Sequence, residues 1–197
     1  MSNKRLKIFL LTIFSAVLVI ICISVFSSKK NETLYLSKNI NKFKLITHSN
    51  EKFDSKLFSN YPSLIFFGFL NCPDVCPFTL TKISEIINKL KDKSDFMRFY
   101  FVTVDPERDK IEELKEYLNA FHPRIIGVTG SNTGIEKFLK YMYVYKKEIP
   151  LDNNNYTIDH STQILLFKKN GNFFGTLSTN EKDNNILGKI NKLINGA

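Results

Sequence analysis

The chain has no tryptophan and only three cysteines among its 197 residues. Cys22 lies inside an apolar N-terminal segment, so Cys72 and Cys76 are the only cysteines in the part that is expected to fold. A single pair argues against a small scaffold held together by several disulfides. The sequence shows no internal repeat, and no Lys/Arg cluster alternates with aromatic residues as a nucleic-acid groove requires. Nucleic acid is therefore not an expected partner.

The formal net charge is +9, from 28 Lys and Arg against 19 Asp and Glu. Such an excess could favour an anionic membrane surface or an acidic partner. We interpret most of it as a Lys-rich solvated surface. Hydrophobic residues make up 43% of the chain and include 18 Phe. The length and composition predict one domain with a sizeable core, plus an appendage.

The segment from Ile8 to Phe26 contains no charged residue and is long enough to cross a bilayer as a helix. Three basic residues precede it and two follow it (Lys4, Arg5 and Lys7; Lys29 and Lys30). This excess predicts a cytoplasmic N-terminus, with the rest of the chain outside. A cleaved signal peptide is the alternative, but the apolar run is longer than a usual signal and no A-x-A-like site follows.

The predicted organisation is therefore a cytoplasmic N-terminus (1–7), a transmembrane anchor (8–26), a polar linker (27–40) and a folded domain (41–197). Nothing before the apolar segment could serve as an organellar transit peptide. We expect a single-pass protein of a bacterial inner membrane, with its folded domain facing the periplasm.

Two cysteines, each followed by a proline, form the motif Cys72-Pro73-Asp74-Val75-Cys76-Pro77. A short apolar run before it, Ser63 to Phe69, predicts a buried strand. Apolar residues at helical spacing follow and predict a helix over Phe78–Leu90 (Leu80, Ile83, Ile86, Ile87, Leu90). A helix N-terminus favours thiolate over thiol. The pair could act as a dithiol/disulfide couple or hold a soft metal ion. The remaining interpretation of the two cysteines is a structural disulfide or two inert buried thiols.

The rest of the chain alternates strands and helices. We predict strands at Phe43–Thr47, Asp95–Val104 and Ile125–Val128, helices at Ile111–Phe121, Thr133–Tyr143 and Ile186–Ile194, a loop over Tyr145–Ile158, and a hairpin of Gln163–Phe167 and Asn172–Leu177. This order indicates an α/β domain whose central sheet is covered on both faces. A thiol pair at the first strand-to-helix junction is the layout of the thioredoxin fold.

Three histidines compete as a third ligand. His48 sits in a predicted turn, and His122 ends a surface helix. His160, in Asp159-His160-Ser161, precedes the hairpin, which in a thioredoxin-like sheet begins opposite the cysteine loop. Two thiolates and one imidazole suit copper, Cu(I) especially, whereas zinc more often takes a fourth protein ligand. Asp159 could orient the imidazole, or be a surface acid.

Four blocks carry a resemblance to the Sco/SenC family. They are Gly68–Pro77 with its two cysteines, Val104-Asp105-Pro106-Glu107-Arg108-Asp109, Gly127–Gly130 and Asp159-His160-Ser161. The resemblance implies a membrane-tethered thioredoxin-like domain with a central mixed sheet flanked by helices. It also implies that Cys72, Cys76 and His160 bind one copper ion, as Cu(I) or Cu(II).

The implied partners are a copper donor and cytochrome c oxidase subunit II, whose dinuclear copper site would receive the copper or have its thiols reduced. Leu70-Asn71 and Ser49-Asn50 depart from the family pattern but touch no ligand.

We favour a metallochaperone without enzymatic turnover. The alternative is a thiol–disulfide oxidoreductase that uses Cys72 and Cys76 without a metal, although thioredoxins carry a cis-proline where this chain has His160. A peroxidase, with Arg108 beside a reactive cysteine, is a weaker reading. For Asp105, Arg108 and Asp109 we weigh two hypotheses. One is a salt-bridged loop near the metal site that positions the cysteine loop or a partner. The other is a helix N-cap by Asp105 or Asp109.

Overall fold

The computed structural model describes residues 10–11, 13–20, 36–152 and 155–196. It divides into two units, Met1–Thr33 and Leu34–Ala197. In the first unit the described residues are helical, with exposed apolar side chains such as Leu11 and Phe14. The rest of the predicted Ile8–Phe26 span lies outside the described residues. Among the residues that are described, we find no helix with the length and apolar character needed to cross a membrane.

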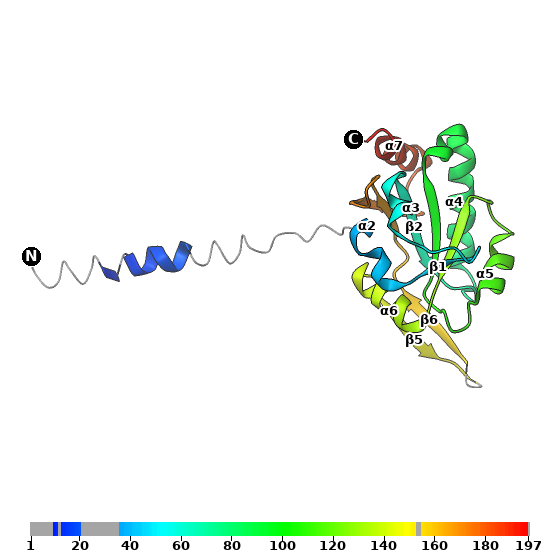
Figure 1. The fold of residues 1–197 in the computed structure, drawn as a ribbon, viewed down its shortest axis with the longest axis horizontal. Helices are drawn as coiled ribbons and strands as arrows, with labels where there is room; N and C mark the ends of the chain where they lie inside the picture. The colour runs from blue at the N-terminus through cyan, green and yellow to red at the C-terminus, as the bar shows by residue number, and fades with distance from the viewer. Residues whose placement is uncertain (1–9, 12, 21–35, 153–154, 197) are drawn as a thin grey trace, which may run out of the picture. The chain divides into compact units, whose positions relative to one another are not determined.

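The second unit is built on a six-stranded mixed sheet in the order β1-β4-β3-β2-β7-β8 (Figure 1). The strands are β1 (Ile46–Thr47), β2 (Ser63–Gly68), β3 (Arg98–Thr103), β4 (Ile125–Thr129), β7 (Ile164–Phe167) and β8 (Phe173–Leu177). β2, β3 and β4 are parallel, while β1, β7 and β8 are each antiparallel to their neighbours. The parallel strands are continuous apolar runs because both of their faces are buried.

Helices cover both faces of this sheet, as predicted. They are α2 (Leu36–Asn39), α3 (Ser55–Ser59), α4 (Val75–Leu90), α5 (Ile111–Leu118), α6 (Asn132–Tyr141) and α7 (Asp183–Ile194), with 3-10 turns η1 (Ile40–Phe43) and η2 (Lys91–Phe96). Phe101 packs on Tyr117 of α5 and Phe67 packs on Phe138 of α6. Phe101 is opposite Phe66 in the β2–β3 pairing, so the two share a face, while Phe67, the next residue of β2, points to the other face. These contacts therefore place α5 and α6 on opposite sides of the sheet.

The structure moves two predicted boundaries. The linker was predicted to end at Ile40, but Leu36 and Ile40 are fully buried in the core. The backbone N–H of Leu36 also donates to the carbonyl of Gly171 in the β7–β8 turn, at 2.8 Å. The predicted strand over Phe43–Thr47 is reduced to Ile46–Thr47, because Phe43 closes the turn η1 and Lys44 has a left-handed conformation.

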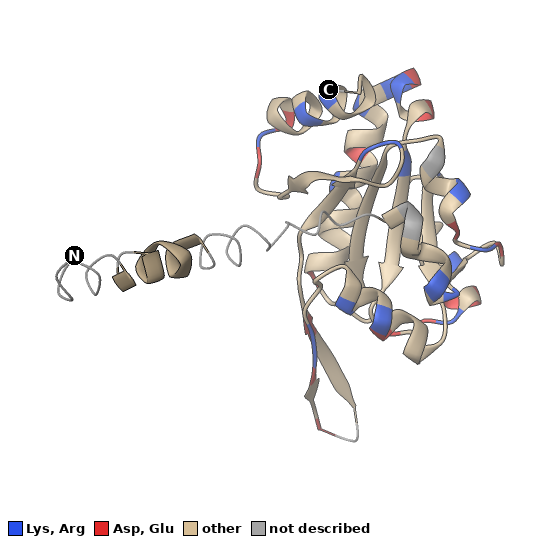
Figure 2. Ribbon diagram, turned by 60° about the vertical axis from the view of Figure 1, so that its left-hand side comes forward, with Lys and Arg blue, Asp and Glu red and all other residues tan. Residues whose placement is uncertain are grey.

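The predicted loop over Tyr145–Ile158 is wrong. β5 (Lys146–Pro150) and β6 (Tyr156–His160) pair there as an antiparallel hairpin, with Lys146 opposite His160 and Pro150 opposite Tyr156. Among the described residues this hairpin forms a sheet of its own, and it extends away from the six-stranded sheet (Figure 2). His160 therefore ends a strand of the hairpin, not a loop.

Candidate metal centre

The first turn of α4 carries the cysteine pair. Cys76 is the second residue of the helix and is buried, while Cys72 lies in the preceding loop and is half-buried. Both are free thiols. The backbone N–H of Cys76 donates to Cys72 Sγ at 3.4 Å, which fixes one sulfur at the helix N-terminus. Pro77 fits the same turn because an N–H there has no helical partner.

A glycine at the end of β2 makes room for the buried sulfur. A Cβ atom on Gly68 would lie 2.8 Å from Cys76 Sγ and 2.7 Å from Cε2 of Phe101. Both distances are well inside van der Waals contact, so no larger residue fits without displacing the sulfur or the ring. From the sequence we include Gly68 in the predicted strand run Ser63 to Phe69 and assign it no role of its own. Its place as the last strand residue before the motif was the available signal.

His160 reaches the thiol pair from β6. Its Nε2 lies 3.7 Å from Cys76 Sγ, and its side chain is buried. Nδ1 lies 2.9 Å from the carbonyl oxygen of Ser161, which can only accept, so Nδ1 carries the proton. In the neutral ring Nε2 then presents its lone pair to Cys76. Phe69 packs edge-on against the imidazole with ring centroids 5.7 Å apart.

The suggestion that Asp159 orients the imidazole is wrong. Asp159 is exposed, whereas Ile158 and His160 are buried, as expected for alternating positions of a strand. The Ser161 carbonyl takes the role instead. A backbone acceptor has no sequence signal, which is why the residue pattern pointed to the carboxylate next to the histidine.

The two thiols have opposite protonation tendencies. A hydrogen bond from the Cys76 thiol lowers the pKa of Cys72, and bonds from backbone N–H groups lower it further, against the effect of partial burial. The pKa of Cys76 is raised, because its proton is shared with Cys72 and because burial disfavours its charged form. Cys72 is thus the thiolate of the pair, as a helix N-terminus favours.

The loop between β3 and α5 touches the cysteine loop. Asp109 is buried, and its Oδ2 accepts hydrogen bonds from the backbone N–H of Leu70 at 3.2 Å and from Oγ1 of Thr103 at 2.5 Å. Arg108 pairs with Asp105 at 2.5 Å. The N-cap of α5 is Lys110, so the alternative of a cap by Asp105 or Asp109 is wrong. The salt bridge and the contact with the cysteine loop are those that the other hypothesis expected, and a positioning role for this loop stays a prediction.

The other two histidines have structural partners. His48 Nδ1 accepts from the backbone N–H of Gly127 at 2.7 Å, and His122 Nδ1 accepts from that of Arg124 at 3.1 Å. Burial lowers the pKa of both imidazoles, each beside a cation, Lys115 and Arg124 respectively. The structure therefore brings only one of the three histidines, His160, to the thiols.

Arg108, the residue on which a peroxidase would depend, forms an ion pair with Asp105 and lies over the Tyr156 ring.

The side chains present fit a soft metal ion, although they do not yet enclose one. Across the described ranges, no three His, Cys, Asp or Glu side chains are gathered as a ready-made metal site. The 3.7 Å between Cys76 Sγ and His160 Nε2 is nevertheless close to the roughly 3.6 Å that zinc-like bond lengths give for two ligands of one tetrahedral ion. Two sulfurs and one imidazole nitrogen are a donor set that copper accepts.

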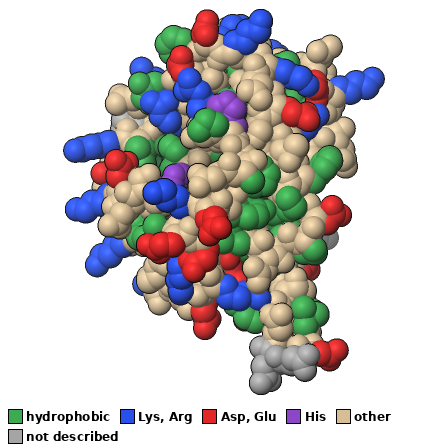
Figure 3. Space-filling model, turned by 90° about the vertical axis from the view of Figure 1, so that its right-hand side faces the viewer, with side chains coloured by type: hydrophobic (Ala, Val, Ile, Leu, Met, Phe, Trp, Pro, Cys, Tyr) green, Lys and Arg blue, Asp and Glu red, His purple; other side chains and the backbone are tan. Residues whose placement is uncertain are grey.

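The surface beside the thiols is apolar. Val75 and Phe78, in the first turn of α4, are 43% and 58% exposed. On the side of the molecule drawn in Figure 3, apolar side chains lie among acidic and basic ones. Val75 and Phe78 could thus offer a partner apolar contacts beside Cys72.

Known proteins are similar to this chain in sequence and in fold. The SCO1/SenC family profile matches residues 32–195. The SCO2-like protein RP587 of Rickettsia prowazekii is 41% identical over 133 residues, which are 66% of this chain but only 65% of that protein. Bradyrhizobium japonicum ScoI with copper bound superposes with a TM-score of 0.72 at 32% identity, covering 76% of this chain and 95% of that one. Yeast Sco1 with copper bound gives 0.71 at 33%, covering 78% and 86%.

The profile thus spans most of the chain, and the matched range contains both cysteines, the 105–109 loop and His160. The chain belongs to the SCO1/SenC family.

Proposed function

We propose that this protein is a membrane-anchored copper metallochaperone that binds one copper ion per chain through Cys72, Cys76 and His160. The observation that carries the proposal is the histidine geometry: Nδ1 is held by the Ser161 carbonyl, so Nε2 faces Cys76 Sγ at 3.7 Å. The copper held by the two solved relatives supports the choice of metal.

The unequal thiols suit a site that must release its cargo. Cys72 is half-buried, already ionised in preference to its neighbour, and beside an apolar surface, so it can be exchanged first with a partner ligand. Cys76 and His160 are buried and would retain the ion until that exchange. Metal loading requires both thiols to be reduced.

The recipient that family membership favours is the dinuclear copper site of cytochrome c oxidase subunit II, supplied in turn by a copper donor. The apolar segment Ile8–Phe26 would hold the domain at a bacterial inner membrane, facing the periplasm, where that subunit would be within reach.

Replacing His160 tests the ligand set. Cu(I) is soft and tolerates two thiolates alone, whereas Cu(II) prefers an added nitrogen ligand. His160→Ala should therefore abolish or greatly weaken Cu(II) binding and spare part of the Cu(I) affinity, while Cys72→Ser or Cys76→Ser should damage both. Elemental analysis gives the stoichiometry, and competition with chelators of known affinity gives the constants.

His48→Ala and His122→Ala are the matched controls, since both histidines bind backbone N–H groups away from the thiols. Copper loss in His122→Ala equal to that in His160→Ala would show that the assignment is wrong.

A thiol–disulfide oxidoreductase is the second candidate, favoured by the thiolate of Cys72 beside the protonated Cys76. The Cys72 thiolate would attack a partner disulfide and release one partner thiolate. Cys76, after losing its proton, would attack Cys72 Sγ and release the second. The partner gains two electrons, and Cys72–Cys76 becomes a disulfide. In this case His160→Ala would leave disulfide exchange largely intact, and no copper phenotype would be seen.

A further inference from the structure

The strand that carries His160 belongs to a hairpin outside the main sheet. At its base, the backbone N–H of Ser161 donates to the Tyr145 carbonyl at 3.1 Å, and that of Tyr145 donates to Ser161 Oγ at 3.0 Å. The hairpin extends from this base and does not pair with the strands of the central sheet within the described residues. Side-chain contacts must therefore fix its orientation, and with it the position of the imidazole.

One arginine supplies several of these contacts. Arg108 lies with its guanidinium carbon 3.7 Å from the centroid of the Tyr156 ring, at the start of β6. Its Nη1 donates to the Tyr156 carbonyl at 2.9 Å and to Oδ1 of Asn155 at 3.2 Å, and its Nε donates to Asp105 Oδ2 at 2.5 Å. The Tyr156 hydroxyl closes the cycle by donating to Asp105 Oδ1 at 2.9 Å. We call Asp105, Arg108 and Tyr156 the hairpin latch.

The loop that carries Asp105 and Arg108 also contacts the loop that carries the cysteines. Asp109, the residue after Arg108, accepts the backbone N–H of Leu70, two residues before Cys72. The 105–109 loop thus contacts the cysteine loop at one end and the His160 hairpin through Arg108. Asp105 and Asp109 are both 1% exposed, so this link is part of the folded interior.

We propose that Arg108 is a positioning residue that sets the place of His160 relative to the two thiols. This inference rests on the proposed function. Arginine suits the role because its flat guanidinium stacks on an aromatic ring and donates in several fixed directions at once. A lysine retains the positive charge beside Asp105 but lacks the several N–H donors of the guanidinium and its flat surface for stacking on Tyr156. Arg108→Lys should therefore make the hairpin more mobile without leaving the Asp105 carboxylate unpaired.

The test begins with the metal-free, reduced full chain. Amide hydrogen exchange in Arg108→Lys should be accelerated about tenfold over Tyr156–His160, and unchanged over the central strand β3. The factor corresponds to the loss of one hydrogen bond to a charged group. Faster exchange in β3 as well would mean general destabilisation and would overturn the positioning role.

The same variant is then loaded with copper. Binding of Cu(II), which uses the imidazole, should weaken about tenfold, and the nitrogen coupling in its electron paramagnetic resonance spectrum should diminish. Binding of Cu(I) should change less than about threefold, because the thiolates are untouched. Tyr156→Phe, which removes only the hydroxyl bond to Asp105, should give a smaller change in the same direction.

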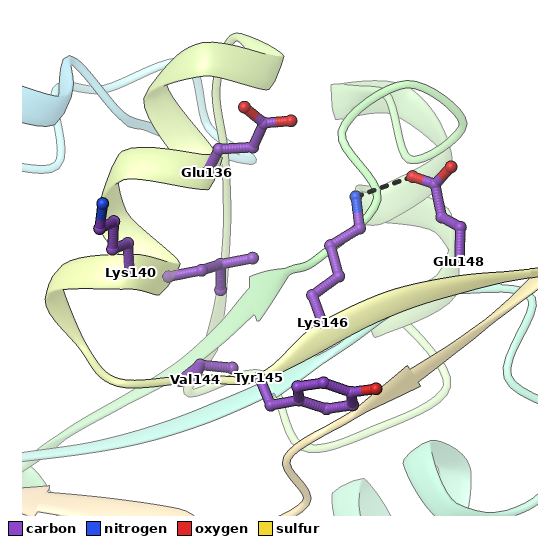
Figure 4. Close-up of a pocket in the computed structure, with 7 residues that line it drawn as sticks. Glu136, Lys140, Val144, Tyr145, Lys146 and Glu148 are labelled. Carbon is purple, nitrogen blue, oxygen red and sulfur yellow. Dashed lines mark ion pairs between the residues drawn. The ribbon is translucent and has the colours of Figure 1, made fainter.

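Glu148→Gln is the matched control. Glu148 also lies on the hairpin and pairs with Lys146 at 3.1 Å, but this ion pair joins two residues of β5 beside the shallow pocket between α6 and the hairpin (Figure 4). Its loss should leave exchange over Tyr156–His160 and the copper spectrum unchanged.

Arg108→Lys with unaltered exchange and an unaltered Cu(II) spectrum would overturn the inference. So would a Glu148→Gln effect of equal size. If the unchanged chain retains no copper, the proposed function fails, while the exchange measurement still decides whether the latch holds the hairpin.

Discussion

The sulfur of Cys76 rests against Gly68 at the end of β2, and the centre depends on the absence of a side chain there. The neighbouring Phe101 ring is fully buried and packs against the rings of Phe66 and Tyr117, so it has little freedom to move aside. The three heavy atoms nearest to the missing methyl are two of this ring and Cys76 Sγ, so the sulfur is the one of them that can shift.

Gly68→Ala should therefore lower the free energy of unfolding by about 1–3 kcal/mol, the usual cost of overpacking a core, and should weaken copper binding by moving Cys76 Sγ. Urea unfolding and copper competition would measure the two effects. Gly175→Ala in β8 is the control, because no atom lies within 4 Å of its added Cβ. Equal losses in the two variants would contradict the role of Gly68.

At the scale of elements, apolar periodicity located the parts of the centre that lie on buried strands and helices. The continuous run Ser63–Phe69 and the helical spacing of Leu80 to Leu90 predicted β2 and α4, and hence the junction that holds Cys72 and Cys76. The helix begins at Val75 and so includes Cys76, earlier than the first apolar residue of the pattern indicated.

The hairpin of β5 and β6 could not be predicted in this way. Lys146-Lys147-Glu148-Ile149-Pro150 is mostly exposed and does not alternate apolar with polar residues, and Asn153-Asn154-Asn155 is typical of a loop. What orders the hairpin is backbone pairing together with Arg108 and Tyr156, which are far apart in the sequence. The contact that places His160 is therefore visible only in three dimensions.

The 105–109 loop adds a pH dependence. Burial raises the pKa of Asp109 to about 6, against the lowering effect of the Thr103 and Leu70 hydrogen bonds. Between its ordinary value of 3.8 and 6, the folded state binds a proton that the unfolded state does not. The contribution of this residue to stability therefore increases as pH falls through 6, by up to about 3 kcal/mol, and stops changing below about 4.

Asp109→Asn removes the titration and retains an oxygen that can accept both hydrogen bonds. At pH 7.5 the variant should be more stable than the unchanged protein, and at pH 4.5 the difference should largely disappear. Urea unfolding of both reduced proteins at the two pH values measures it. A stability difference between the two proteins that does not vary with pH would show that folding does not raise the pKa of Asp109.

For the molecule as a whole, the sequence predicted one folded domain and an appended apolar segment, and the structure divides the chain at Thr33 and Leu34. The folded unit begins earlier than the polarity of residues 27–40 indicated, because two apolar residues four apart, Leu36 and Ile40, are enough to bring a short helix into the core. The average polarity of residues 27–40 does not reveal such a pair of apolar residues.

The charges that flank the apolar segment predict its topology in the membrane. Ile8–Phe26 has three basic residues on its short N-terminal side and two just after it, and the side with more positive charge is retained in the cytoplasm. A reporter that is active only outside the cytoplasm, fused after Ala197, should therefore be active, and the full-length fusion should remain with the membrane fraction. Replacing Lys4, Arg5 and Lys7 by Gln removes the charge bias and should reduce the reporter activity, whereas the same change at Lys29 and Lys30 should not. Release of a shortened soluble form would show instead that the segment is cleaved, and the domain would then meet its partner without a tether.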